Sequence, residues 1–156
     1  KETYSGFQNS QGMPIRDVLM PNLKHMQMCF RYEDLLFTHA GVSETWLTKY
    51  SEFLNEEDLI DERINMLWEN KPHSFTFTNN FVYSRKGDDP TQSPIWIRPQ
   101  SLAIAGLKEY THIVGHTQVE HPAKAKGLNV ILVDSPDYYT EIDTVSKEIQ
   151  FYNFSE

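Results

Sequence analysis

Three short, continuous apolar runs constrain the fold of this chain most strongly. They are residues 35–37 (LLF), 113–114 (IV) and 130–133 (VILV), and each is followed by a small or polar residue. Such runs are typical of strands in a sheet whose two faces are both covered. They predict a buried strand that leads into a loop within residues 34–41, and two more over residues 111–115 and 130–134.

Other patterns predict the elements around these strands. Residues 56–70 carry apolar side chains at three- and four-residue steps, which predicts an amphipathic helix with its acids outward. Residues 101–110 (SLAIAGLKEY) also indicate a helix, with Ser101 as its cap. Residues 148–154 alternate in polarity and predict an edge or half-exposed strand. The order of elements is mixed α/β, leaning to strands at the end.

Composition and charge narrow the classes of partner. The 156 residues suffice for one domain with a real core. The formal net charge of −8 argues against nucleic acid or an anionic membrane as the main partner, although a local Arg or metal ion still allows a phosphorylated ligand. The single cysteine, Cys29, excludes an intrachain disulfide and fits a reducing compartment, so we expect a cytoplasmic protein.

Two histidines occupy equivalent places in the pattern. His39 and His116 each follow an apolar strand candidate and stand beside small residues. Ligands of open α/β sheets bind beyond the carboxyl ends of the strands, and neutral imidazole is a common metal ligand. On the pattern alone, each histidine fits a hydrogen-bonded residue of the core better than a metal ligand.

Four segments together resemble the calcineurin-like phosphoesterases, the family of the serine/threonine protein phosphatases. Residues 37–43 (FTHAGVS) resemble the first histidine motif of that family and residues 113–117 (IVGHT) its second. Residues 94–99 (PIWIRP) resemble a Trp-x-Arg segment, and residues 129–134 (NVILVD) the strand that follows the second histidine. The resemblance covers the chain from about Lys24 onward.

The resemblance implies a fold and a site. The fold would be α+β or α/β, part of a four-layer metallophosphoesterase sandwich with two mixed β-sheets flanked by helices. His39 and His116 would bind the same one of two metal ions (manganese, iron or zinc), and Arg98 would hold a phosphoryl oxygen of a phosphorylated substrate. A surface salt bridge is the alternative interpretation of Arg98, and core packing is the expected role of Trp96.

The chain departs from the family pattern in one large respect. The family's Asp-x-His, Gly-Asp-x-x-Asp-Arg-Gly and Gly-Asn-His-Glu strings do not occur here. The resemblance therefore implies that residues 1–156 are the C-terminal portion of a single metallophosphoesterase domain whose N-terminal metal-binding half is absent. We expect that half, or a complementary chain, as a partner, and little activity from this chain alone.

Two classes of function remain open from the sequence. The first is a phosphoester hydrolase in which a metal-bound hydroxide attacks the ester, with residues 72–94 forming part of the substrate rim. The second is a non-catalytic domain that binds a phosphorylated ligand weakly through Arg98. Nothing in the sequence decides between a phosphoprotein and a dinucleotide polyphosphate as the substrate.

The remaining polar candidates are assigned to structure. Asp134 ends an apolar strand, and we expect it in a turn or as a hydrogen-bond acceptor behind the site. Four further histidines are expected to be structural or exposed: His25, His73, His112 and His121.

Overall fold

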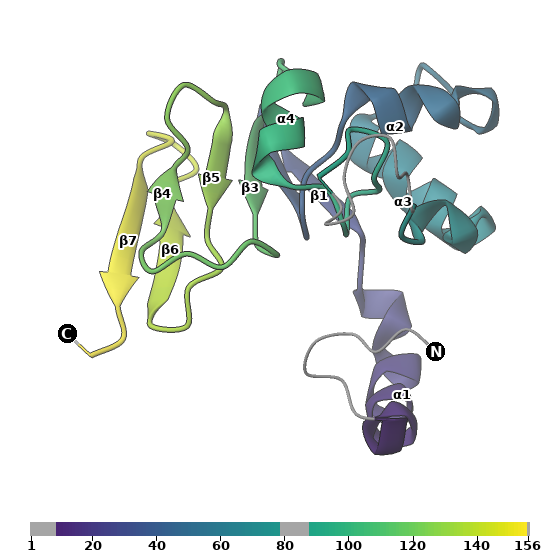
Figure 1. Ribbon diagram of the computed structural model, residues 1–156, viewed down its shortest axis with the longest axis horizontal. Coiled ribbons are helices and arrows are strands. Elements are labelled where there is room, and N and C mark those ends of the chain that lie inside the picture. Colours follow the sequence, from purple (N-terminus) through teal and green to yellow (C-terminus); the bar gives the residue numbers. More distant parts are fainter. Residues whose placement is uncertain (1–8, 79–87, 156) are drawn as a thin grey trace.

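One five-stranded mixed sheet forms the centre of the computed structural model, which describes residues 9–78 and 88–155 (Figure 1). Its strands lie in the order β1–β2–β3–β5–β4. Their bounds are Cys29–Tyr32 (β1), Leu35–Thr38 (β2), Thr111–Val114 (β3), Ala123–Lys124 (β4) and Val130–Leu132 (β5). β2, β3 and β5 run parallel, whereas β1 and β4 are antiparallel to their neighbours. The three apolar runs are therefore strands, as predicted, and the structure shows that they form the parallel centre of the sheet.

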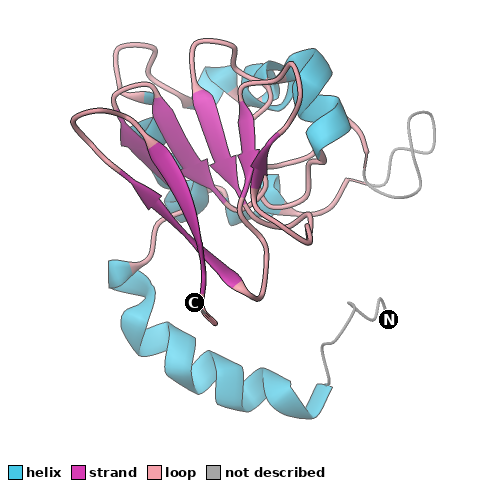
Figure 2. Cartoon of the chain, turned by 90° about the vertical axis from the view of Figure 1, so that its left-hand side faces the viewer, coloured by secondary structure: helices cyan, strands magenta, loops and turns pink. Residues whose placement is uncertain are grey.

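Helices cover one face of this sheet, and a β-hairpin covers the other (Figure 2). The helices are Glu44–Lys49 (α2), Ile60–Asn70 (α3) and Pro99–Ala105 (α4), with 3-10 turns at Ser51–Phe53 (η3) and Pro72–Phe75 (η4). One buried cluster joins Leu36 of β2 to Trp46 of α2 and Ile64 of α3. A second joins Val114 of β3 to Leu102 of α4. The side chains that face the helices hold the two layers together.

The hairpin consists of Tyr138–Ile142 (β6) and Ile149–Asn153 (β7), paired antiparallel and separate from the main sheet. The Lys147 ammonium ties it to the β1–β2 turn through Glu33 at 2.7 Å and Asp34 at 2.6 Å. The strand expected over residues 148–154 is thus confirmed as β7. The four-layer sandwich with two mixed sheets is not confirmed, because the described residues form one mixed sheet and one antiparallel hairpin.

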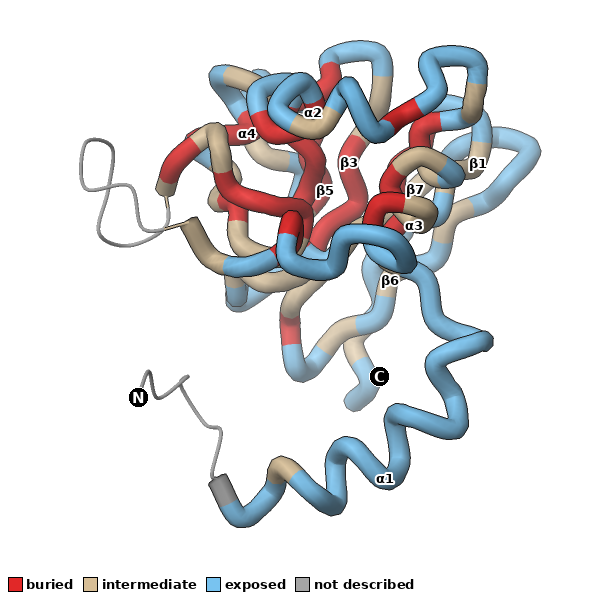
Figure 3. The backbone as a smooth tube through the Cα atoms, turned by 90° about the vertical axis from the view of Figure 1, so that its right-hand side faces the viewer, coloured by how far each residue is buried: buried red, intermediate tan, exposed pale blue. Residues whose placement is uncertain are grey.

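The first helix stands apart from the rest of the molecule (Figure 3). It spans Gly12–Asn22 (α1) between the 3-10 turns Asn9–Gln11 (η1) and Leu23–His25 (η2), and it buries no residue. Its exposed apolar side chains are Met13, Ile15, Val18, Leu19 and Met20. Within the described residues, no helix is long and apolar enough to cross a membrane.

Helix boundaries differ from the expected ones for local reasons. Residues 56–70 were expected to be helical, but α3 begins at Ile60 because the Asn55 and Asp58 side chains close a turn at 3.0 Å before it. The Glu62 carboxylate then accepts a hydrogen bond from the Leu59 amide at 3.0 Å, which caps the helix start.

The helix expected over residues 101–110 is α4, shifted toward the N-terminus. Pro99 occupies its first turn, where the fixed backbone angle of proline is compatible with a helix, and Ser101 is a buried residue inside the helix rather than its cap. The helix ends at Ala105, and Gly106 follows. The long connection expected over residues 72–94 contains η4, and residues 79–87 of it lie outside the described residues.

Candidate functional site

The carboxyl ends of the three parallel strands bring His39, His116 and Asp134 to one edge of the sheet. His39 follows β2 directly, and His116 and Asp134 each stand two residues beyond β3 and β5. The Gly115 amide donates to the His39 carbonyl at 3.0 Å, which holds the ends of β2 and β3 together. The expectation that the two histidines meet at this edge is confirmed.

The two imidazole rings are in direct contact. His39 Nε2 lies 3.1 Å from His116 Nδ1, so one of these nitrogens donates a hydrogen bond to the other. The ring centroids are 4.9 Å apart. His116 Nε2 is buried, and a backbone hydrogen bond between the His116 ring and Trp96 raises the pKa of this histidine. The ring is therefore held from two sides, by His39 and by the Trp96 backbone.

The backbone at His116 adopts an uncommon conformation. Its φ is 60°, in the left-handed region, and the Thr117 amide donates to the Gly115 carbonyl at 2.6 Å across it. A non-glycine residue held in this region stores about 1–3 kcal/mol, and such positions cluster at functional sites. The tight turn directs the chain away from β3 immediately after the strand.

Glycine is required two residues after His39. Gly41 has a φ of +115°, and a Cβ atom placed on it would lie 2.3 Å from the Leu102 side chain of α4. Any larger residue would combine backbone strain with a steric clash. Gly41 thus lets the loop after β2 pack closely against α4, which fixes the position of His39.

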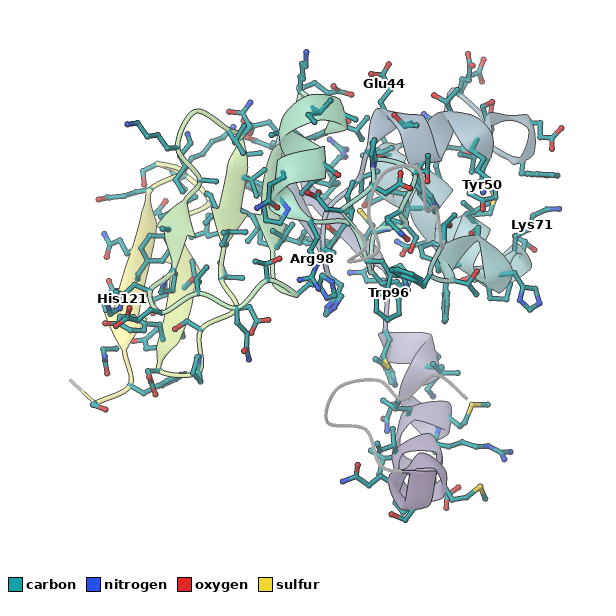
Figure 4. The ribbon with its side chains drawn as sticks, viewed as in Figure 1. Glu44, Tyr50, Lys71, Trp96, Arg98 and His121 are labelled. Atoms are coloured by element: carbon teal, nitrogen blue, oxygen red, sulfur yellow. The ribbon has the colours of Figure 1, made fainter. Side chains whose placement is uncertain are left out.

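Arg98 and Trp96 reach the site from the segment before α4, and Figure 4 shows them close together. The Ala40 amide donates to the Pro94 carbonyl at 2.7 Å, which ties this segment to the end of β2. Arg98 Nη1 lies 3.3 Å from Thr117 Oγ1 and 3.5 Å from the His116 carbonyl. The Trp96 ring contacts the His116 ring edge-on, with centroids 5.9 Å apart.

Burial, together with nearby charges, keeps both imidazoles neutral near pH 7. Burial lowers the pKa of His39, and the Asp134 carboxylate opposes that shift. Burial also lowers the pKa of His116, to about 4, and the Arg98 guanidinium and the neighbouring His39 ring lower it further. The Asp134 carboxylate and a backbone hydrogen bond to Trp96 oppose this shift. A neutral imidazole carries one lone pair and one N–H, so it both accepts and donates a proton.

We expect the low pKa of His116 to make stability depend on pH. The unfolded chain binds a proton at this side chain below about pH 6.5, whereas the folded chain resists protonation down to about pH 4. The contribution of neutral His116 to the free energy of unfolding is therefore fully present above about pH 6.5, and it is lost progressively as the pH falls toward about 4. We expect a loss of about 1–3 kcal/mol over that interval, discounted for the partial exposure of the ring.

Urea unfolding at pH 7.5 and pH 4.5 measures this effect. His116→Asn is the matched control, because asparagine does not titrate and accepts a positive φ. The native protein should lose more stability between the two pH values than the variant does. Equal losses in both proteins would show that His116 titrates normally in the folded state.

Cys29 is a buried core residue and takes no part in the site. Its side chain is 1% exposed and packs with Leu36 and Trp46. Burial raises the pKa of the Cys29 thiol to about 12, and the negative charge of Asp61 adds to that shift. A thiol with so high a pKa carries almost no thiolate near pH 7, so it is a poor nucleophile.

The burial of Cys29 predicts slow reaction with thiol reagents. In the folded protein at pH 8, we expect a disulfide reagent to modify Cys29 at least about a hundredfold more slowly than in 8 M urea. The measurement is the absorbance of the released thiolate over time. A native-state rate close to that in urea would mean that Cys29 is exposed.

The other histidines occupy the structural or exposed places expected of them. The His112 ring is buried and hydrogen-bonded through Nε2 to the Leu107 carbonyl at 3.1 Å. His25, His73 and His121 are exposed. Asp134 was expected in a turn or behind the site, but its charge acts on both site imidazoles. The sequence signal that could have identified it is its place at the end of the third apolar run.

The donors available to a cation at this edge are few. His39 and His116 contribute lone pairs, and no group of three or more His, Cys, Asp or Glu side chains placed to hold a metal ion occurs within residues 9–78 and 88–155. The metal-ligand roles expected of His39 and His116 stay a prediction.

Comparisons with known proteins give a partial likeness in fold. No family model matches the chain, and no curated protein matches it. Solved structures of a cold-active protein tyrosine phosphatase from a psychrophilic Shewanella species, and of a mutant cold-active protein tyrosine phosphatase, match with 21% identity and a TM-score of 0.42. Each match covers 73% of this chain and 35% of that chain, so this chain spans about a third of the length of those phosphatases.

These matches correct two expectations from the sequence. The solved structures that match are described as protein tyrosine phosphatases and not as calcineurin-like metallophosphoesterases, so the family assignment expected from the sequence finds no support in them. The cofactor of two metal ions (manganese, iron or zinc) was implied only by that assignment, and it finds no support in these matches either. Since the likeness reaches a TM-score of only 0.42, the chemistry of the site has to be argued from this chain's own residues.

Proposed function

We propose that this chain contributes a phosphoryl-binding site to a phosphoester hydrolase, with Arg98, His39 and His116 facing the phosphoryl group. One observation supports the proposal above the others. A guanidinium without a carboxylate partner among the described residues and two imidazole rings in direct contact lie together at the carboxyl edge of three parallel strands. Ligands of open α/β sheets bind at this edge.

Arg98 supplies the positive charge of the proposed site. Within the described residues no carboxylate pairs with it, and its two hydrogen bonds are long, at 3.3 and 3.5 Å. The surface salt bridge considered from the sequence is therefore not seen in this part of the chain. A guanidinium with free donors matches two phosphoryl oxygens at once, whereas an ammonium acts as a point charge.

The histidine pair supplies proton transfer in the proposed reaction. Hydrolysis forms a bond from a water oxygen to phosphorus and breaks the ester P–O bond. A neutral imidazole accepts the proton that the attacking water loses, and its N–H partner supplies the proton that the leaving oxygen gains. His39 and His116 are both neutral near pH 7 and 3.1 Å apart, so they meet this requirement.

The proposal assigns the activity to the enzyme that contains this chain. The chain spans about a third of the phosphatases it resembles, and we expect residues 1–156 alone to turn over little substrate. The exposed apolar side chains of α1 are compatible with a further polypeptide, either an N-terminal half or a complementary chain. That partner stays a prediction, and so do a phosphorylated substrate and a cytoplasmic location.

Titration of the 156-residue chain with inorganic phosphate tests the proposal. Two-dimensional NMR of the histidine rings and arginine side chains reports which groups respond. We expect saturable shifts at His39, His116 and Arg98, with a dissociation constant on the order of millimolar, as befits one guanidinium and two neutral donors. A separate titration with a divalent cation tests the metal-ligand prediction for the two histidines.

Arg98→Lys and Arg16→Lys form the matched pair for this titration. Arg16 lies on the exposed helix α1 and should bind no phosphate, so its replacement should leave the dissociation constant unchanged. Arg98→Lys should weaken phosphate binding about tenfold or more, because the two-pronged hydrogen bonding is lost. Equal binding by both variants would contradict the proposed site.

A further inference from the structure

An aromatic groove lies beside the phosphoryl-facing residues. It has a volume of about 240 Å³ and is lined chiefly by Trp68, Pro72, Phe75, Phe77, Ile95 and Trp96. None of the described residues that line it is charged. In a chain with a net charge of −8, an uncharged groove of this composition is suited to an apolar ligand.

The rings of the groove are held in fixed edge-to-face contacts. Trp68 packs on Phe75 with centroids 5.5 Å apart at 88°, and Phe77 packs on Trp96 at 5.4 Å and 78°. Phe75 is 1% exposed and forms the base, whereas 36% of Trp68 is exposed at the rim. The rings of Trp68, Phe77 and Trp96 therefore line the groove above Phe75, and they need no rearrangement to contact a bound aromatic ring.

Trp96 connects the groove to the candidate site. Its ring contacts Phe77 on the side of the groove and His116 on the side of the site, with centroids 5.4 and 5.9 Å apart. Arg98 follows two residues later and reaches the carbonyl of His116. Trp96 therefore borders both the groove and the candidate site, and Figure 4 labels Trp96 and Arg98 at this site.

We propose that the aromatic groove binds the ring of an aryl phosphate ester, so that the site prefers aryl esters over alkyl esters. This inference rests on the proposed phosphoryl site. Trp96 borders both the groove and His116, so an aryl ring bonded to the ester oxygen would contact this indole while its phosphate contacts Arg98. Contacts between aromatic rings add binding free energy beyond that from the apolar area they bury, and an alkyl chain does not make such contacts. We expect phenyl phosphate to bind about tenfold more tightly than methyl phosphate.

Parallel titrations of the 156-residue chain test this preference. The ligands are inorganic phosphate, methyl phosphate, butyl phosphate and phenyl phosphate, followed by NMR at the indole N–H groups and the histidine rings. Phe77→Leu removes one ring while keeping an apolar side chain, and should reduce the phenyl-to-methyl ratio to about two. Trp68→Leu is the second groove variant, and Tyr139→Leu on the distant hairpin is the control that should keep the tenfold ratio.

The outcomes separate this inference from the function on which it rests. A phenyl-to-methyl ratio near tenfold that falls in both groove variants supports the inference. If phosphate binds but phenyl and methyl phosphate bind equally, the groove inference is overturned and the proposed phosphoryl site stands. If butyl phosphate binds as tightly as phenyl phosphate, the preference for an aryl ring is overturned. If none of the four ligands binds, the proposed function is overturned and this inference with it.

Discussion

Replacing Arg98 by lysine should lower phosphoester turnover, in the enzyme that contains this chain, by about ten- to a thousandfold. Lysine keeps the positive charge but loses the planar fork that donates to two phosphoryl oxygens at once. Charge that develops on those oxygens in the transition state is stabilised by donors already in place, and removing one such donor has effects of this size. The measurement is kcat and KM with an aryl phosphate substrate.

The fold should survive this substitution. Arg98 is half-buried, and its side chain makes only two long hydrogen bonds among the described residues. Arg16→Lys on α1 serves as the control and should retain full turnover. Should Arg98→Lys unfold the protein or leave the rate unchanged, Arg98 would be a structural residue and the proposed phosphoryl contact would be wrong.

Replacing Trp46 by alanine should destabilise the fold more than any substitution at the site. The side chain is 1% exposed, its ring packs on Tyr50 and Phe75 at 5.4 and 5.3 Å, and its Nε1 donates to the Ser74 carbonyl at 3.1 Å. Alanine leaves a large cavity and an unpaired buried carbonyl. We expect a loss of about 3–5 kcal/mol in the free energy of unfolding.

Thermal unfolding followed by circular dichroism measures the effect of Trp46→Ala. For a chain of this size, the expected loss corresponds to a fall in Tm of about 10 °C. Trp46→Phe keeps most of the ring and loses only the indole hydrogen bond, so about 1–2 kcal/mol is expected. A Trp46→Ala variant as stable as the native protein would mean that the cluster around α2 and α3 does not hold the fold together.

The centre of the sheet could be predicted because its sequence signal is local. Residues 35–37, 113–114 and 130–133 are apolar without interruption, and such runs are typical of strands covered on both faces. Parallel strands share one carboxyl edge, so the meeting of His39 and His116 followed from their places after two of these runs. The third run ends in Asp134, whose influence on both rings depends on strand order, which the sequence does not state.

Elements stabilised by tertiary contacts were harder to predict. Strand β6 was not expected, because Tyr138–Ile142 mixes polar and apolar residues and gains its order by pairing with β7. The aromatic groove could not be predicted either, since Trp68 and Trp96 are far apart in the sequence and come together in the fold with Phe75 and Phe77. The expectation that residues 72–94 form part of a substrate rim stays a prediction.

The family assignment rested on short motifs. Each comprised five to seven residues around a histidine, an arginine or a strand end, and unrelated α/β proteins place polar residues at the same edge. The motifs nevertheless selected the side chains that the structure brings together. His39, His116 and Arg98 remain the residues on which the proposed function depends.

A crystal structure of this chain with bound orthophosphate tests the central claim most directly. The account predicts phosphate oxygens about 2.7–3.1 Å from the Arg98 guanidinium and from a ring nitrogen of His116 or His39. Phosphate bound elsewhere, with Arg98 turned away and both rings without contact to it, would contradict the account.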